Sequence, residues 1–375
     1  MRSLSDTITR LAALRAKPAS PNPGDGHDRL SDLTDFGSNP GALRARFYIP
    51  DDLPRHAPLV VVLHGCTQTA AGYDHGSGWS QLADEQGFAL LFPEQRRANN
   101  ASLCFNWFVP GDIQRNRGEA LSIRQMIETF VVAHGLDRRR IFVTGLSAGG
   151  AMTSVMLATY PDIFAGGAII AGLPFASAAT IPEAFESMRG HDGRSASHLQ
   201  GLVRGASTHK GPWPAISIWQ GSTDSTVDAS NAEAILGQWR EVHGLRKTPA
   251  RTEIVDGHRR RVWCDADGRP LIEEYIIAGM GHGTPLKTAG DEGLGKGGAF
   301  MLDVGISSTR HIARFWGLPK SGEAQTAKAA RARLKAQVPV ANGAREREPV
   351  PPAPHITTGV KTIIEDALRK VGLMR

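Results

Sequence analysis

The sequence predicts an α/β protein whose mostly parallel central sheet carries helices on both faces. Two near-continuous apolar runs, Leu59-Val-Val-Val-Leu63 and Phe88-Ala-Leu-Leu-Phe92, are typical of strands that are buried on both sides. Strand-like and helix-like stretches then alternate along most of the chain, which is the pattern of a parallel sheet covered by helices. The run Gly145-Leu-Ser-Ala-Gly149 lies between one such strand and one such helix.

The remaining elements follow the same alternation. Glu119–His134 is expected to be a helix, Arg140–Thr144 a strand, and Gly150–Ala158, which contains no proline, a second helix. Later elements of the predicted domain are strands at Gly167–Ala171, Ala215–Trp219, Arg251–Val255, Arg261–Cys264 and Leu271–Ala278, and helices at Asn231–His243, with Ser230 as N-cap, and Asp303–Trp316.

The chain is predicted to contain one large domain, residues 41–317, between two different ends. Residues 1–40 are expected to form an amphipathic segment and a linker rich in proline and glycine. Residues 174–214 are longer than a usual connection between two strands and predict a lid-like insertion near the site. Residues 318–355 have the composition of a disordered linker, and residues 356–375 that of a C-terminal amphipathic helix.

Composition and charge exclude several classes of protein. The net charge is +6, from 43 basic and 37 acidic residues, and the basic clusters Arg138–Arg140 and Arg259–Arg261 are typical of solvated faces. No nucleic-acid-binding motif surrounds them, so we expect no nucleic-acid partner. No apolar run approaches the roughly 20 residues of a transmembrane helix. The N-terminus has no signal-peptide pattern, so the default expectation is a cytoplasmic location.

The chain contains three cysteines, Cys66, Cys104 and Cys264. They are too few and too scattered for a disulfide framework or a zinc site. A Cys66–Cys104 bridge is one alternative, since both residues fall near the expected site. Without a visible signal peptide, the sequence favours reduced thiols.

Gly145-Leu146-Ser147-Ala148-Gly149 fits the G-x-S-x-G nucleophile elbow. In that motif a sharp turn between a strand and a helix raises the serine oxygen above the sheet edge. The two glycines allow strand and helix to approach where a side chain would clash. Ser147 is therefore the candidate nucleophile.

A serine hydroxyl needs a histidine to accept its proton and a carboxylate to orient that histidine. Asp224 follows the strand that ends in Trp219, and His282 lies between glycines after the strand that ends near Ala278. Both lie at carboxyl ends of strands, in the chain order serine, acid, histidine. The weaker alternatives are Asp228 and Asp256 for the acid, and His258 and His311 for the base.

An oxyanion hole needs two N–H groups directed at the developing negative charge. The amide of Ala148, directly after the nucleophile, is expected to supply one. The loop His64-Gly-Cys-Thr-Gln68 offers the Gly65 and Cys66 amides for the other, and Cys66 is the preferred candidate. The Cys66 thiol is not expected to be the nucleophile, because Ser147 occupies the elbow.

With these residues assigned, the chain resembles the poly(3-hydroxybutyrate) depolymerase-type esterases of the α/β-hydrolase superfamily over roughly residues 40–317. The stretches that carry the resemblance are His64–Gln68, Cys104-Phe-Asn-Trp-Phe108, Gln114-Arg-Asn-Arg-Gly-Glu119, Gly145–Met152, Gly211-Pro-Trp-Pro214 and Gly279-Met-Gly-His282.

The resemblance implies an α/β-hydrolase fold with the triad Ser147, Asp224 and His282, and no cofactor or metal. It implies hydrolysis of short-chain polyhydroxyalkanoates, as 3-hydroxybutyrate polymer or oligomers. Related esterases act on feruloyl or acetyl esters of plant polysaccharides, and a general short-chain esterase is a further alternative. His64, Trp107 and Phe108 are expected to line the substrate site, although a core role is equally open for the two aromatic residues.

The remaining expectations concern the location of the protein, the acid loop, the two ends of the chain and the oligomeric state. Many members of the resembled family are secreted, so an extracellular location is the alternative to the cytoplasm. At the start of the acid loop, Gln220 replaces a histidine that is frequent in the family. In a hypothesis of another class, the amphipathic ends dock on a hydrophobic granule or membrane surface. The sequence leaves the oligomeric state open.

Overall fold

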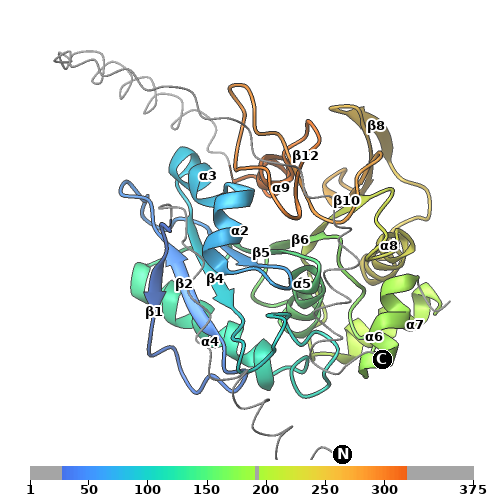
Figure 1. The fold of residues 1–375 in the computed structure, drawn as a ribbon. Coiled ribbons are helices and arrows are strands. Elements are labelled where there is room, and N and C mark those ends of the chain that lie inside the picture. The colour runs from blue at the N-terminus through green and yellow to red at the C-terminus, as the bar shows by residue number, and fades with distance from the viewer. Residues whose placement is uncertain (1–27, 191–193, 319–375) are drawn as a thin grey trace, which may run out of the picture.

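The computed structural model describes residues 28–190 and 194–318, and these contain a ten-stranded sheet (Figure 1). Strands β4, β3, β5, β6, β7 and β10 run parallel in that order. At one edge β2 pairs antiparallel with β4 and with β1, and at the other edge β9 pairs antiparallel with β10 and with β8. The strands are β1 (Ser31–Leu33), β2 (Arg44–Tyr48), β3 (Leu59–Leu63), β4 (Ala89–Glu94), β5 (Ile141–Leu146), β6 (Gly166–Ile170), β7 (Ala215–Gly221), β8 (Arg251–Val255), β9 (His258–Cys264) and β10 (Pro270–Ile277). The predicted mostly parallel sheet is confirmed.

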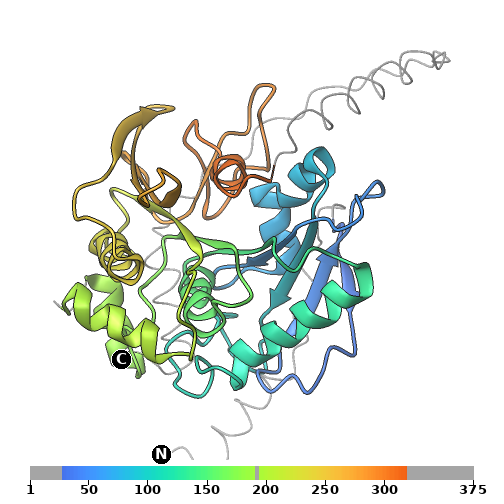
Figure 2. The same ribbon diagram turned by 180° about the vertical axis from the view of Figure 1, so that it is seen from behind.

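Helices cover both faces of this sheet, as expected. Alternate residues of a strand point to opposite faces. Leu59, Val61 and Leu63 of β3 join the core beneath α4 (Gly118–His134), α5 (Ala148–Thr159) and α8 (Ser230–His243). Val60 and Val62 join a second core beneath α2 (Ala70–Ser77), α3 (Trp79–Gln86) and α9 (Ser308–Phe315). Seen from behind, α4 lies in front of the N-terminal strands β1 and β2 (Figure 2).

The N-terminal boundary of the domain is earlier than predicted. Residues 31–33, which were assigned to a linker, form β1 and pair with β2. The side chain of Arg46 on β2 binds the carboxylates of Asp28 and Asp32. These strands are short and carry charges, as edge strands do, and their pairing is visible only in the folded chain.

Two predicted helix starts are also wrong. The helix expected at Asp303–Trp316 begins at Ser308, because Met301–Asp303 forms strand β12, which pairs with β11 (Thr284–Leu286). The hydroxyl of Ser307 caps this helix by accepting from the N–H of Arg310. Ser230 is the first residue of α8 and not its N-cap, and its N–H donates to the carboxylate of Asp228.

The predicted insertion between β6 and β7 contains α6 (Ile181–Arg189) and α7 (Ala196–Gly205). The Gln238 side chain of α8 donates to the carbonyl oxygens of Phe175 and Leu199, which ties α7 to the domain. The predicted segments 1–27 and 319–375, including the C-terminal amphipathic helix and almost all of the linker before it, lie outside the described residues. Within residues 28–190 and 194–318, no helix is both long and apolar enough to span a bilayer.

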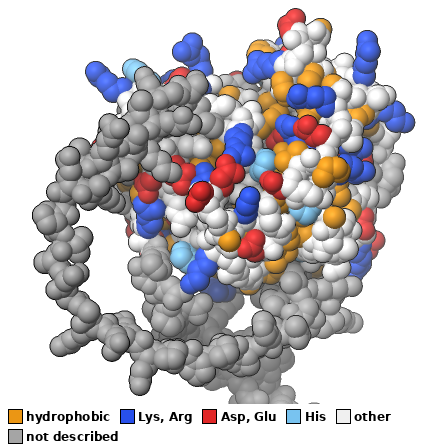
Figure 3. Space-filling view, turned by 90° about the horizontal axis from the view of Figure 1, so that it is seen from above, with side chains coloured by type: hydrophobic (Ala, Val, Ile, Leu, Met, Phe, Trp, Pro, Cys, Tyr) orange, Lys and Arg blue, Asp and Glu red, His pale blue; other side chains and the backbone are white. Residues whose placement is uncertain are grey.

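The basic cluster Arg259–Arg261 is only partly a solvated face. Arg260 binds the buried carboxylate of Glu273 at 2.8 Å, and Arg261 binds that of Glu274 at 2.6 Å. Over the part of the surface that Figure 3 shows in colour, acidic and basic side chains are interspersed. Two arginines of the cluster therefore pair with buried glutamates of β10.

Candidate active site

Ser147 lies on the sharp turn between β5 and α5 that the sequence predicted. Its backbone has φ 58° and ψ −119°, a conformation that a residue with a side chain rarely adopts. The turn is held by a hydrogen bond of 2.9 Å from the Ser147 N–H to the carbonyl of Ile170 on the neighbouring strand β6. Strained backbone of this kind is found where the surrounding structure fixes a functional group in place.

The glycines around Ser147 are required by the close approach of helix and sheet. A Cβ atom on Gly145 would lie 2.4 Å from the carbonyl oxygen of Gly149. A Cβ atom on Gly149 would lie 2.3 Å from the carbonyl oxygen of Leu63 on β3. Real Cβ atoms do not come this close, so both positions demand glycine, as the elbow motif requires.

The structure brings Asp224 and His282 into direct contact. The Nδ1 atom of His282 lies 2.7 Å from Oδ2 of Asp224, and both side chains are buried. The other carboxylate oxygen accepts from the N–H groups of Thr226 and Val227 at 2.8 and 2.9 Å. Gln220, which departs from the family pattern, donates its amide to Oδ2 at 3.2 Å. The carboxylate is thus fixed by three donors besides the histidine.

The loops that carry these two residues are joined to each other. They follow β7 and β10, which are parallel neighbours, so both emerge at the same edge of the sheet. The N–H of Thr223 donates to Met280 O, and that of Ser222 donates to Ile277 O, both at 3.0 Å. A Cβ atom on Gly221 would lie 2.4 Å from Met280 O, so the two loops touch through their backbones.

The alternative acids and bases have other partners. Asp228 accepts from the N–H of Ser230 at the start of α8. Asp256 lies 3.1 Å from Nε2 of His311, whose other ring nitrogen contacts the hydroxyl of Tyr275. The ring nitrogens of His258 bind the backbone of Ala278 and Val304.

Ser147 and His282 line one small hollow, together with Gly65, Cys66, Gln68, Leu146 and Phe300. The Phe300 ring packs edge-on against the His282 imidazole, with centroids 6.1 Å apart. Sequence analysis missed Phe300, which lies in an irregular segment at φ 62°. Among the residues described, the Ser147 hydroxyl forms no hydrogen bond with His282. Such contacts are frequently long in unliganded enzymes.

The residues that carry the two expected oxyanion donors lie at the same cavity as Ser147. Cys66 and Ala148 both line the larger cavity beside Ser147. Across residues 28–190 and 194–318, neither backbone N–H has an acceptor. Two unsatisfied N–H groups beside the candidate nucleophile are what an oxyanion hole would require.

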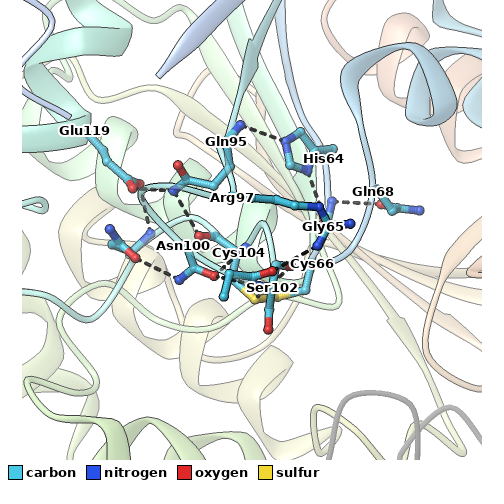
Figure 4. The surroundings of a disulfide bond; sticks show 12 residues. His64, Gly65, Cys66, Gln68, Gln95, Arg97, Asn100, Ser102, Cys104 and Glu119 are labelled. Atoms are coloured by element: carbon cyan, nitrogen blue, oxygen red, sulfur yellow. Dashed lines mark hydrogen bonds between the residues drawn. A yellow bond between two sulfur atoms is a disulfide. The ribbon is translucent and has the colours of Figure 1, made fainter. Parts of the chain in front are cut away.

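Cys66 and Cys104 form a disulfide, so the expectation of reduced thiols is wrong for this pair (Figure 4). The bond joins the loop after β3 to the loop after β4, across 38 residues of sequence. A hydrogen bond of 2.7 Å from the N–H of Thr67 to Ser102 O runs beside it. The strands β3 and β4 are adjacent, and this adjacency, invisible in the sequence, brings the cysteines together.

We predict that the double variant Cys66→Ser/Cys104→Ser is less stable than the wild type. Loop-closure entropy alone corresponds to about 4 kcal/mol for a loop of this length. Urea denaturation checks this, with Cys264→Ser as the control, since Cys264 forms no disulfide. Thiol titration of the denatured wild type without reductant is expected to find Cys264 alone. Three titratable thiols, or an unchanged urea midpoint in the double variant, would contradict the bond.

A buried glutamate organises the loop that carries Cys104. Glu119 accepts from the side chain of Gln95 at 2.6 Å and from the backbone N–H of Asn106 at 2.8 Å (Figure 4 shows the pair with Gln95). The side chain of Asn99 donates to the same carboxylate at 3.2 Å. Burial is the main cause that raises the pKa of Glu119 to about 8.

This raised pKa predicts a pH-dependent contribution to stability. Glu119 ionises near pH 4.5 in the unfolded chain but only near pH 8 in the folded one. The unfolded state therefore releases the proton first, and the contribution of Glu119 declines as pH rises between these values, by up to about 1.4 kcal/mol per unit. Urea unfolding of wild type and Glu119→Gln at pH 5.5, 6.5 and 7.5 checks this. The free energy of unfolding of the wild type, minus that of the variant, should fall as pH rises. A difference that stays constant between pH 5.5 and 7.5 would contradict the prediction.

His64 does not line the substrate cavity, contrary to the expectation. Its side chain is buried, with 1% exposed, and its ring packs on Phe105. Its nitrogens bind the backbone of Gly65 and Gln95. The ring therefore lies behind the loop that carries Cys66.

The larger cavity beside Ser147 has a volume of about 470 Å³ and mostly apolar walls. Trp107 and Phe108 line it, as expected, and Trp107 also belongs to the core. Helix α6 of the insertion forms another wall with Ile181, Phe185 and Met188. Sequence analysis placed the insertion near the site but identified none of these three side chains.

Comparison with solved structures shows the fold of this protein. An acetyl xylan esterase from Aspergillus awamori superimposes with a TM-score of 0.66 at 24% identity, covering 77% of this chain and 99% of that one. This likeness, together with the mostly parallel sheet covered by helices, shows that the protein has the α/β-hydrolase fold.

Residues 44–260 match the family model described as esterase PHB depolymerase, and the chain belongs to this family of carboxylic ester hydrolases. Poly(3-hydroxyalkanoate) depolymerase C of Paucimonas lemoignei is 46% identical over 291 residues, which cover 77% of this chain and 70% of that protein. A probable acetylxylan esterase A of Aspergillus flavus is 31% identical over 271 residues, which cover 70% of this chain and 86% of that protein. Feruloyl esterase B of Talaromyces stipitatus is 28% identical over 265 residues, covering 68% and 72%.

Proposed function

We propose that this esterase hydrolyses short-chain polyhydroxyalkanoate esters, as polymer or oligomers of 3-hydroxybutyrate, through an acyl-enzyme on Ser147. The observation that carries the proposal is the buried Asp224–His282 contact of 2.7 Å, which shares a site with Ser147. The order serine, acid, histidine and the strained turn at Ser147 support the same assignment.

In the proposed reaction, His282 takes the proton of the Ser147 hydroxyl as its oxygen attacks the ester carbonyl. Asp224 binds Nδ1–H of His282, so that Nε2 is free to accept the proton and the resulting imidazolium is stabilised. The N–H groups of Cys66 and Ala148 would stabilise the negative oxygen of the tetrahedral intermediate. His282 then protonates the leaving alcohol, and water releases the acid from Ser147 by the same steps.

The size and the apolar walls of the cavity suit a small apolar acyl group. Its walls bear Trp107, Phe108, Phe185 and Met188, and its volume of about 470 Å³ is at the small end of ligand sites. A hydroxybutyrate ester presents a short aliphatic chain and no charge, which suits such walls. The depolymerase relative at 46% identity is consistent with this substrate class.

Hydrolysis of acetyl or feruloyl esters of polysaccharides is the second candidate. It rests on the names of the relatives at 31% and 28% identity. A general short-chain esterase activity is the third alternative, since the mechanism itself makes no demand on the alcohol.

A panel of esters distinguishes these candidates. We expect kcat/KM for 3-hydroxybutyrate trimer and tetramer to exceed that for methyl ferulate and acetylated xylo-oligosaccharides by about tenfold or more, a difference of about 1.4 kcal/mol in transition-state binding. p-Nitrophenyl acetate and butyrate serve as references for the general esterase. A preference for the feruloyl or acetylated sugar ester would overturn the proposed substrate.

We further propose that the protein functions in an oxidising compartment, which favours the extracellular alternative over the cytoplasmic one. The Cys66–Cys104 disulfide supports this, because such bonds persist in oxidising environments. Granule docking by the chain ends stays a separate hypothesis about residues outside those described. Co-sedimentation with polyhydroxybutyrate granules, comparing the full chain with one that ends at residue 318, tests it.

A further inference from the structure

We infer that His64 is a positioning residue for ester hydrolysis: it orients and polarises the Gly65–Cys66 peptide, whose N–H is an oxyanion donor. The inference rests on the proposed function, and it assigns a task to a side chain that does not touch the substrate cavity.

The contacts of His64 fix which ring nitrogen carries the proton. The backbone N–H of Gln95 points at Nε2 over 3.1 Å, and a backbone N–H can only donate. Nε2 must therefore present its lone pair, and in the neutral ring the proton resides on Nδ1. Nδ1 lies 2.8 Å from Gly65 O, which can only accept, so Nδ1–H donates to that carbonyl. Both contacts demand the same tautomer (Figure 4).

The surroundings of His64 keep this tautomer neutral. The side chain is 1% exposed, and burial lowers the pKa of the imidazole. Protonation would also place a hydrogen on Nε2 against the N–H of Gln95. Both nitrogens are occupied, so His64 is not a proton acceptor for Ser147, and it does not compete with His282 for the role of base.

The carbonyl that His64 binds belongs to the peptide unit of the proposed oxyanion donor. In a planar trans peptide the C=O and the next N–H point in opposite directions. Holding Gly65 O toward His64 therefore directs the N–H of Cys66 away from it, where no acceptor is present among the residues described. A hydrogen bond to the carbonyl also polarises the peptide and strengthens its N–H as a donor.

The neighbouring contacts hold the rest of the loop, and the N–H of Gln68 adds a second, longer hydrogen bond of 3.3 Å to Gly65 O, beside the 2.8 Å contact with His64. The N–H of Gly65 donates to the side chain of Gln68 at 2.8 Å, and the disulfide ties the Cys66 side chain to Cys104. The Gln95 residue that holds the ring is itself bound to the buried Glu119 at 2.6 Å. Figure 4 shows this connected series from Glu119 to Gly65.

Two substitutions separate positioning from simple packing. In His64→Asn the amide nitrogen falls where Nδ1 lies, so the variant keeps a donor for Gly65 O and loses the acceptor for Gln95. In His64→Gln the amide oxygen falls where Nε2 lies, so the variant keeps that acceptor and loses the donor. Both substitutions remove the imidazole ring that packs on Phe105.

We expect His64→Gln to lower kcat for p-nitrophenyl butyrate by about 10- to 100-fold, with KM changed less than about threefold, because a misdirected donor weakens transition-state stabilisation. His64→Asn should retain kcat within about fivefold. Thermal unfolding of each variant is measured alongside. Equal kcat in the two variants overturns the inference, whether both match the wild type or both fall along with stability.

A measurement on the unmodified protein keeps the test open if the variants do not fold. We expect ¹⁵N spectra of the histidine rings to show a neutral His64 with its proton on Nδ1 at pH 6, and a proton on Nε2 overturns the inference. Ser147→Ala is assayed in parallel. Full activity in Ser147→Ala would overturn the proposed function. If Ser147→Ala is inactive but His64→Asn and His64→Gln have equal kcat, only the inference about His64 is overturned.

Discussion

Replacement of Ser147 with alanine is expected to lower kcat/KM for p-nitrophenyl butyrate by about 10⁴-fold or more while the protein stays folded. The hydroxyl is the atom that would form the acyl-enzyme, and loss of a nucleophile leaves only binding and oxyanion stabilisation. The turn itself should survive, because the hydrogen bond from residue 147 to Ile170 O uses the backbone. Initial rates and circular dichroism of the variant check both parts.

The matched control for this variant is Ser38→Ala. Ser38 is exposed and binds Gln125 on α4, apart from the site residues, so its loss should change kcat/KM less than about twofold. Ser147→Ala with more than about a hundredth of the wild-type activity would refute the assignment of the nucleophile.

Asp224→Asn is expected to lower kcat by about 10³- to 10⁴-fold. The carboxylate accepts from four groups: His282, Gln220, Thr226 and Val227. An asparagine has a single acceptor oxygen, so it cannot satisfy both the two backbone N–H groups and Nδ1–H of His282. If its NH₂ group turns toward His282, it selects the wrong tautomer for accepting the Ser147 proton.

Asp228→Asn tests whether this effect belongs to position 224. Asp228 follows closely in sequence, but its carboxylate accepts from the N–H of Ser230 at α8. We expect its kcat to stay within about threefold of the wild type and its unfolding midpoint to fall slightly. A larger loss of kcat in Asp228→Asn than in Asp224→Asn would exchange the roles of the two residues.

The parallel core of the fold was predictable because the amino-acid composition of its central strands is typical of buried strands. β3 and β4 are continuous apolar runs, and such runs mark strands with both faces buried. β1, β2, β11 and β12 were not predicted, since they are short and gain their stability from distant partners. The start of α9 was misplaced for the same reason, because β12 precedes it.

Within the site, the residues near the elbow and the strand ends could be placed from local pattern and chain order. Contacts between residues on different strands could not be placed in this way. Cys66 and Cys104 meet because β3 and β4 are neighbours, and Phe300 reaches His282 from an irregular segment. His64 was expected to line the substrate site, and only the positions of Gln95 and Gly65 O show that its ring turns inward.

The most direct test of the account is to trap the acyl-enzyme. The wild type is mixed with p-nitrophenyl butyrate, quenched in acid within the first turnovers, digested and mapped by mass spectrometry. Asp224→Asn, whose deacylation should be slow, is treated in the same way. If Ser147 is the nucleophile, we expect one butyryl group per protein, on the peptide that contains Ser147. A butyryl group on another residue, or rapid hydrolysis with Ser147 unmodified in both proteins, would contradict it.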